Sequence, residues 1–470
     1  MLNPIRYEIP LFLPDKSKLK EYDEYLYKVD KLIEEEQNVI EESMKEEILK
    51  NWWTKRILLW RKWYWLIFRF KVLLINHTYN LTFRDTEKMI KNNISVRLFL
   101  DIMWEEKIKI PKYSTIQWWN QEFGESFIKK MNEKFLIPIA KKKKILKWRK
   151  SRTDTTVVEE NISYPTDSTL LKKWKDLLIR WIGKIDEILS NGNKFTKTWV
   201  KKGIRRVKKI YYDIKKYARK RWEEAKEEIK NKYEELTNIL SSTIKITENT
   251  IKEVKQKTKR KWFKIKVALK WAISELETTL CKVWKVVTQT RKRVLEWKTV
   301  QMKDKLISYF SDRATIIKKW KEGKSVEIGR KLSVTEWESG IVTNWQVLEW
   351  NPNDSTLLRD TLEDIKKSTW KNPKNNSFDR WYRNNKEIEI LEKEYNVKLH
   401  IPKQWKKSKA DIKREKTWVF KTHQRFRSWW EWKISILKRR AWLRKLRVRW
   451  KSVETKIWWW IFSDNMKIIA

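Results

Sequence analysis

Glycine is scarce in this chain, with only seven among 470 residues, whereas an ordinary share of about 7% would supply roughly 33. Left-handed turns, which glycine adopts without strain, must therefore be made by other residues. Proline is also rare, with nine in all and none between Pro165 and Pro352. The lack of proline excludes a proline-rich linker in that interval and permits long helices.

Cysteine and histidine are nearly absent. The single Cys281 cannot form an internal disulfide, and no cysteine or histidine cluster has the spacing of a zinc site. His77, His400 and His423 are far apart in the sequence, so we interpret each as a packing or surface residue. These absences exclude a disulfide scaffold and a zinc-finger protein.

Long apolar runs free of charge are missing as well. The most apolar stretch, residues 57–75, has five cations in or beside it: Arg56, Arg61, Lys62, Arg69 and Lys71. A bilayer span of about 20 residues does not tolerate that many charges. The segment 1–12 contains Arg6 and Glu8, which interrupt the apolar core of a signal peptide. We expect a cytoplasmic protein with no membrane partner.

Positive charge and tryptophan are what the chain has in excess. Lysine and arginine number 109 against 61 acidic residues, giving a net charge of +48, and there are 33 tryptophans. A charge this large predicts a polyanionic partner, because neutralising phosphates releases counterions and gives strong binding. Nucleic acid is the first candidate and an anionic membrane surface the second.

The pattern along the chain predicts an α/β protein with a mixed sheet. We expect a charged helical segment over 1–50, a helical DNA-binding domain over 51–140, and a basic linker with a first strand over 141–167. Residues 168–310 are rich in Lys and Glu at helical spacing and predict an insertion of two or more long helices. Residues 311–470 then complete the sheet domain.

The expected sheet elements rest on short β-prone runs and helical spacing. They are a strand bearing Asp154, strands over 324–334 and 340–350, a helix over 356–367, strands ending at Asp379 and Pro402, and a basic helix over about 420–440.

Three acids stand out by position: Asp154 on the first strand, Asp379 at a strand end and Glu431 on the last helix. On one continuous helix, Arg427 and Lys438 would share a face with Glu431, at spacings of minus four and plus seven. One interpretation is structural, an ordinary Arg–Glu pair. The other is a divalent metal site, because carboxylates approach closely when Mg²⁺ lies between them. Two such ions catalyse phosphoryl transfer.

The sequence around these acids resembles that of bacterial insertion-sequence transposases of the DDE type, which have a ribonuclease H-like core and a Y-x2-R-x3-E-x6-K signature. RTDTTVVEENISYPTDSTLL is similar to their first catalytic segment, FDRWY to D-R-G-Y, and QRFRSWWEWKISILKRR to the signature. The resemblance implies that Asp154, Asp379 and Glu431 are catalytic ligands of two Mg²⁺ ions, which Mn²⁺ could replace. Arg427 and Lys438 fall on the signature's cations, whereas Gln424 stands where the signature has tyrosine.

The resemblance covers roughly residues 150–175 and 318–465. HTYNLTFRDTE, in the expected helical DNA-binding domain, resembles the family's N-terminal helical region more weakly. It implies DNA strand cleavage and strand transfer at the ends of a mobile element. The partners would be double-stranded DNA, as terminal inverted repeats and target, with the protein a homo-oligomer on DNA at the nucleoid. Two alternatives stay open: a catalytically inactive, transposase-derived DNA-binding protein, and a helical RNA- or membrane-surface protein that only the charge supports.

Several tryptophans stand where that family has glycine, namely Trp174, Trp350, Trp381 and Trp432. Our hypothesis is that the gene uses UGA for glycine and that this sequence renders UGA as tryptophan. The rival interpretation, stacking platforms for DNA bases, explains the excess of tryptophan but not the missing glycine. Trp459 stands where the family itself has tryptophan. The activity is therefore assigned to the product with glycine restored.

The codons test this hypothesis. We expect UGA at Trp350, Trp381 and Trp432, read by sequencing the gene. UGG at these three positions would show that the tryptophans are genuine.

Overall fold

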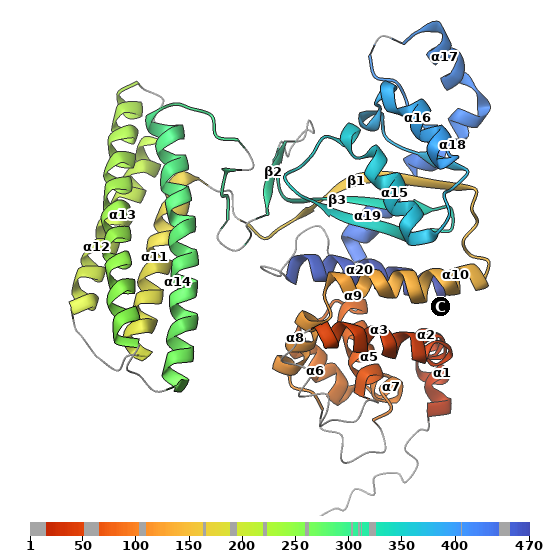
Figure 1. Ribbon diagram of the computed structural model, residues 1–470, viewed down its shortest axis with the longest axis horizontal. Coiled ribbons are helices and arrows are strands. Elements are labelled where there is room, and N and C mark those ends of the chain that lie inside the picture. The colour runs from red at the N-terminus through yellow and green to blue at the C-terminus, as the bar shows by residue number, and fades with distance from the viewer. Residues whose placement is uncertain are drawn as a thin grey trace, which may run out of the picture. The chain divides into compact units, whose positions relative to one another are not determined.

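The computed structural model describes residues 16–50, 65–102, 110–162, 166–188, 195–219, 223–258, 263–301, 304–308, 311, 313–318, 326–405, 407–440 and 452–470 (Figure 1). The chain divides into two compact units. The first joins Met1–Asn161 to Arg330–Ala470, and the second is Ile162–Gly329.

The first unit begins with a head of short helices, as the sequence predicts. Its elements are α1 (Leu19–Tyr22), α2 (Glu24–Glu35), α3 (Gln37–Lys50), α5 (Trp65–Thr78), α6 (Phe83–Asn92), α7 (Ile94–Phe99), α8 (Tyr113–Glu122), α9 (Glu125–Met131) and α10 (Ile137–Lys142). Side-chain caps fix several helix starts, because Asp23, Thr82 and Asn93 each accept a hydrogen bond from a first-turn backbone N–H.

Helix α5 is the buried centre of the head, and it carries two buried cations. Lys71 Nζ lies 2.7 Å from Asp30 Oδ1 and donates to the Phe99 carbonyl at 2.8 Å. Arg69 lies 3.7 Å from the buried Glu122. Pairing of this kind is what keeps buried charges tolerable. Among the described helices, none is both long enough and apolar enough to cross a membrane.

The C-terminal helix α20 (Ser452–Ile469) completes the head, packing on α5 and α9 (Figure 1). Trp459 is fully buried, stacks on His77 with ring centroids 5.2 Å apart, and donates to the Phe123 carbonyl. His77 also hydrogen-bonds Asn120 at 2.8 Å, and burial lowers its pKa to about 3. The prediction that His77 is a packing residue is confirmed.

A mixed sheet follows the head, which confirms the predicted α/β class. Its strands are β1 (Lys150–Glu159), β2 (Thr315–Lys318), β3 (Val326–Trp337), β4 (Val342–Leu348), β5 (Asn375–Ser377) and β6 (Lys398–His400). The order is β2-β3-β1-β5-β6, with β4 also paired to β3. β1, β5 and β6 are parallel neighbours, whereas β3 pairs antiparallel with β2 and β4.

The helices of the C-terminal part of the chain are α15 (Leu358–Thr369), α16 (Asn385–Tyr395), α17 (Lys409–Lys416), α18 (Trp418–Ser428) and α19 (Trp430–Arg440). α15, α16, α18 and α19 pack on strands of the sheet, whereas α17 packs on α18. The expected single helix over 420–440 is wrong, because the chain breaks at Trp429 between α18 and α19. The break accompanies a change of burial: Trp430 turns inward over the Arg152 guanidinium, while Trp429 stays 71% exposed.

The second unit is a bundle of four long helices, which confirms the expected pair or more. They are α11 (Asp167–Ile188), α12 (Phe195–Tyr217), α13 (Glu223–Thr258) and α14 (Phe263–Thr290). Their apolar faces form one core that includes Leu178, Leu240 and Leu276. Trp174 is buried in that core, so its side chain fills space that glycine would leave empty.

The two places where the chain passes between the units are next to each other in the first unit. Glu160 is the second-last residue before the bundle segment and Arg330 the first after it. Arg330 Nε donates to Glu160 Oε1 at 2.8 Å, and both side chains are buried. This ion pair ties β1 to β3, which are neighbouring strands.

Tryptophan recurs at left-handed backbone positions. Among the described residues, nine other than glycine have positive φ, and four of these are the exposed Trp297 (54°), Trp350 (59°), Trp370 (63°) and Trp405 (39°). Trp370 caps the end of α15, where glycine is the usual residue. Left-handed backbone is costly for a residue with a Cβ atom. These four positions favour the glycine hypothesis.

Trp381 is a further test of the glycine hypothesis, because a strand end that turns sharply often needs positive φ or close backbone approach, which glycine supplies. Its φ is not positive; it lies in a short 3-10 helix (Arg380–Tyr382). Its indole is 50% exposed and lies beside the Arg380 guanidinium, 5.4 Å from ring centroid to Cζ. The expectation of positive φ at this turn is therefore wrong, because the chain turns here with right-handed backbone.

Replacing Trp370 by glycine should stabilise the protein. We expect Trp370→Gly to raise the free energy of unfolding by about 1 kcal/mol, because it relieves a left-handed non-glycine residue. Trp432→Gly is the control: Trp432 is exposed on helix α19, where glycine should lower stability by about 0.5 kcal/mol. Urea unfolding of both variants measures the difference. Equal effects of the two substitutions would contradict the expectation.

Candidate active site

Two of the predicted acids lie side by side because of the strand register. Parallel strands β1 and β5 pair Lys150 with Asn375 and Arg152 with Ser377. The same offset places Asp154 opposite Asp379, just beyond the end of β5. Asp379 is also the cap of the short helix that follows, accepting from the Arg380 N–H at 2.7 Å. Both carboxylates therefore sit at one edge of the parallel part of the sheet.

Arg427 on α18 joins the two acids. Its Nη1 lies 3.1 Å from Asp154 Oδ2 and its Nη2 lies 3.5 Å from Asp379 Oδ1. One planar guanidinium thus spans both carboxylates, which lysine could not do. The helix that carries Arg427 is itself held against β6, since Gln424 Nε2 donates to the His400 carbonyl at 2.8 Å. Gln424, in the place of the signature tyrosine, has this supporting contact.

The position of Asp154 makes its carboxyl hard to ionise. Burial, and then the charge of Asp379, raise the pKa of Asp154 to about 7, against the opposing effect of Arg427. A smaller contribution comes from Asp354, which accepts from Thr155 Oγ1 and pairs with Lys331 Nζ at 2.8 Å. The single positive charge of Arg427 cannot balance two ionised carboxylates, so the site has a deficit of positive charge.

Sequence reasoning missed two groups around these acids, Asp354 and Tyr382. Tyr382 is fully buried, and burial together with the charges of Asp354 and Asp154 holds its pKa well above the usual value. Its ring packs on Phe378 with centroids 5.0 Å apart. Tyr382 lies in the FDRWY segment that resembles a transposase motif, and Asp354 lies just before the helix expected over 356–367, so the sequence did contain a signal for them.

Glu431 and Lys438 are placed differently. Both lie on α19, beyond the break at Trp429, and Glu431 is exposed. Across the part of the chain that the structure describes, no group of three or more His, Cys, Asp or Glu could hold a metal ion. The structure therefore brings Asp154, Asp379 and Arg427 together without Glu431.

The other two histidines are packing residues, as predicted. His400 and His423 stack with ring centroids 4.0 Å apart, and both are buried. Burial, and then the charge of His423, lower the pKa of His400 to about 3. Neutral stacked imidazoles at the end of β6 help to hold α18 on the sheet.

Comparison with known proteins adds one finding. A family model described as Transposase domain (DUF772) matches residues 16–122. That match supports a transposase family. It covers the helical head from α1 to α8 and does not reach the acids on the sheet. No curated protein and no solved structure matches the chain.

The titration of Asp154 should appear in the pH dependence of stability. A folded pKa of about 7 lies above the ordinary 3.8, so the stabilisation from its neutral form is complete below pH 3.8 and lost as pH rises through 7. We expect wild type to lose stability relative to Asp154→Asn over that range, measured by urea unfolding with a chelator present. The exposed Asp360 supplies the control Asp360→Asn. Parallel curves for wild type and Asp154→Asn would refute the prediction.

Proposed function

We propose that this protein is a DDE transposase, which cleaves DNA strands at the ends of an insertion sequence and joins them to target DNA. The observation that carries the proposal is the pair Asp154 and Asp379, which the register of β1 and β5 places opposite each other and which Arg427 joins. A head that matches a transposase domain supports it independently. The partners would be terminal inverted repeats and target DNA, bound by a homo-oligomer in the cytoplasm.

The sheet supports a ribonuclease H-like core. The sheet, in the order β2-β3-β1-β5-β6 with β4 also on β3, combines antiparallel pairing of β3 with β2 and β4 and parallel pairing of β1, β5 and β6. In such a core, acids on the first strand and after its parallel neighbour meet at one edge, as Asp154 and Asp379 do.

The donor set fits Mg²⁺ or Mn²⁺. Mg²⁺ is commonly held by one or two carboxylates together with substrate phosphates and water, and Asp154 and Asp379 offer two carboxylates short of positive charge. A bound divalent ion would polarise the attacking hydroxyl and stabilise the leaving oxygen. Cation binding would also favour the ionised form of Asp154, whose pKa is about 7 without it. Arg427 would then be available to contact the phosphate.

Glu431 would complete the ligand set in the DNA-bound state. A continuous helix through Trp429 would place Glu431 one turn beyond Arg427 on the same face. Lys438, further along α19, would either orient Glu431 or contact the DNA backbone. We therefore propose that α18 and α19 straighten when DNA binds.

A cleavage assay tests the function. The substrate is DNA carrying the ends of the encoding element, with Mg²⁺ and with chelator, and strand cuts are resolved on a denaturing gel. We expect Mg²⁺-dependent cutting that falls by more than about 100-fold in Asp154→Asn and in Asp379→Asn, because loss of even outer-shell partners of a metal costs 10–100-fold.

The matched control is Asp360→Asn, an exposed acid on α15, which should keep full activity. Full activity in Asp154→Asn would refute the mechanism. DNA binding without cutting, in both the wild-type chain and a version with glycine at Trp350, Trp381 and Trp432, would instead identify an inactive DNA-binding relative.

A further inference from the structure

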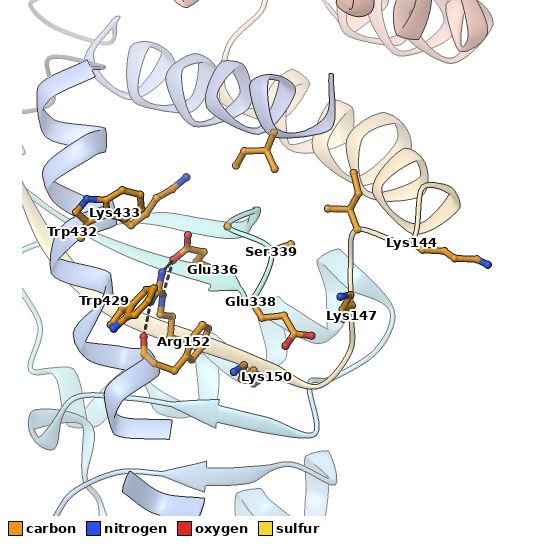
Figure 2. A pocket seen from close by; sticks show the side chains of 14 residues that line it. Lys144, Lys147, Lys150, Arg152, Glu336, Glu338, Ser339, Trp429, Trp432 and Lys433 are labelled. Carbon is orange, nitrogen blue, oxygen red and sulfur yellow. Dashed lines mark hydrogen bonds and ion pairs between the residues drawn. The ribbon is translucent and has the colours of Figure 1, made fainter. Parts of the chain in front are cut away.

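A second feature of the first unit is a cationic pocket of about 790 Å³. Its walls carry five cations against two carboxylates, Glu336 and Glu338. Figure 2 shows that these charged residues come from the loop before β1, from β1 itself, from β3 and the turn after it, and from α19. The volume lies within the range of pockets that hold small ligands, so it can take one strand of a polymer but not a duplex.

Two of the five cations already have partners. Arg152 is bound to Glu336, Nε to Oε2 at 2.6 Å, and donates to the Phe426 carbonyl. Lys433 pairs with Asp464 at 2.7 Å. Lys144 and Lys147 have no ion pair with any described residue, and Lys150 Nζ lies over the Phe426 ring, 4.8 Å from its centroid. Lysines without a counter-carboxylate are suited to phosphate.

The same pocket offers groups for a base. Trp429 presents an indole that is 71% exposed. Among the described atoms, Glu338 Oε1 and Ser339 Oγ are buried without a hydrogen-bond partner. A carboxylate would repel phosphate, but it accepts hydrogen bonds from the amino group of a base. Cations with an exposed aromatic ring are the combination that binds unpaired nucleic acid strands.

The pocket and the acid pair both include residues of the same strand, β1. Lys150, Arg152 and Asp154 alternate on β1 and therefore share a face. The contacts with α18 agree with this placement. Arg152 donates to the Phe426 carbonyl, and Asp154 accepts from the side chain of the next residue, Arg427. At about 3.3 Å per residue, Lys150 lies roughly 13 Å from Asp154, which a few nucleotides can span.

We propose that this pocket binds an unpaired segment of the DNA strand beside the phosphate being cut. Lys147 and Lys150 hold its backbone, Trp429 stacks on a base and Glu338 accepts from that base. The proposal rests on the proposed function, because it takes Asp154 as the reacting end of the strand.

The test is fluorescence anisotropy without Mg²⁺, using a labelled duplex with a single-stranded overhang and a blunt duplex of the same sequence. We expect Lys147→Glu to weaken overhang binding by about 10-fold and to lower the salt slope by about 1. Trp429→Ala should weaken it by at least about 5-fold, and Trp429→Phe should restore most of the loss. Blunt-duplex binding should change by less than about 2-fold.

Lys393→Glu makes the same charge change on the exposed face of α16 and should leave overhang binding intact. Equal losses for blunt and overhang DNA, or no loss in any pocket variant, would overturn the proposal. If the pocket variants lose overhang binding while neither wild type nor the version with glycine at Trp350, Trp381 and Trp432 cuts DNA, the pocket stands and the proposed function fails. If wild type cuts DNA and the pocket variants cut and bind as well as wild type, the pocket fails alone.

Discussion

The contact on which the site depends is the guanidinium of Arg427 between Asp154 and Asp379. Two carboxylates in register on neighbouring strands repel each other, and burial makes the repulsion costly. Arg427 offsets part of it at 3.1 and 3.5 Å. The placement of α18 follows from this contact and from the Gln424 bond to β6. A cation-dependent function gains from the remaining deficit of positive charge, since a site already neutral would attract no further ion.

The elements near the acids could be predicted from sequence, because β-branched residues at 155–158 and the apolar alternation of β3 are local signals. The register that pairs Asp154 with Asp379 could not, since it depends on contacts over more than two hundred residues. The motif resemblance nevertheless named both acids. The break at Trp429 was also invisible, because helical spacing continues across it and only the burial of Trp430 distinguishes the two halves.

Helix α20 shows the same limit from the other end of the chain. From sequence alone its apolar run gives no sign of where it packs. In the structure it packs at the centre of a helical head that begins more than three hundred residues earlier. Trp459 belongs there on physical grounds, as a buried ring stacked on His77. The tryptophans therefore fall into two groups. Buried ones such as Trp459 pack in the core, whereas exposed ones with left-handed backbone, such as Trp370, occupy positions that favour glycine.

The ion pair of Glu160 with Arg330 has an evolutionary consequence. Because it holds both ends of the segment that contains the bundle on neighbouring strands, the pairing of β1 with β3 does not depend on the length of the helices between them. The four helices could therefore be lengthened or exchanged while the acid pair keeps its place, provided that β2, which lies in the same segment, is kept. Variation in such proteins should therefore concentrate between these two residues.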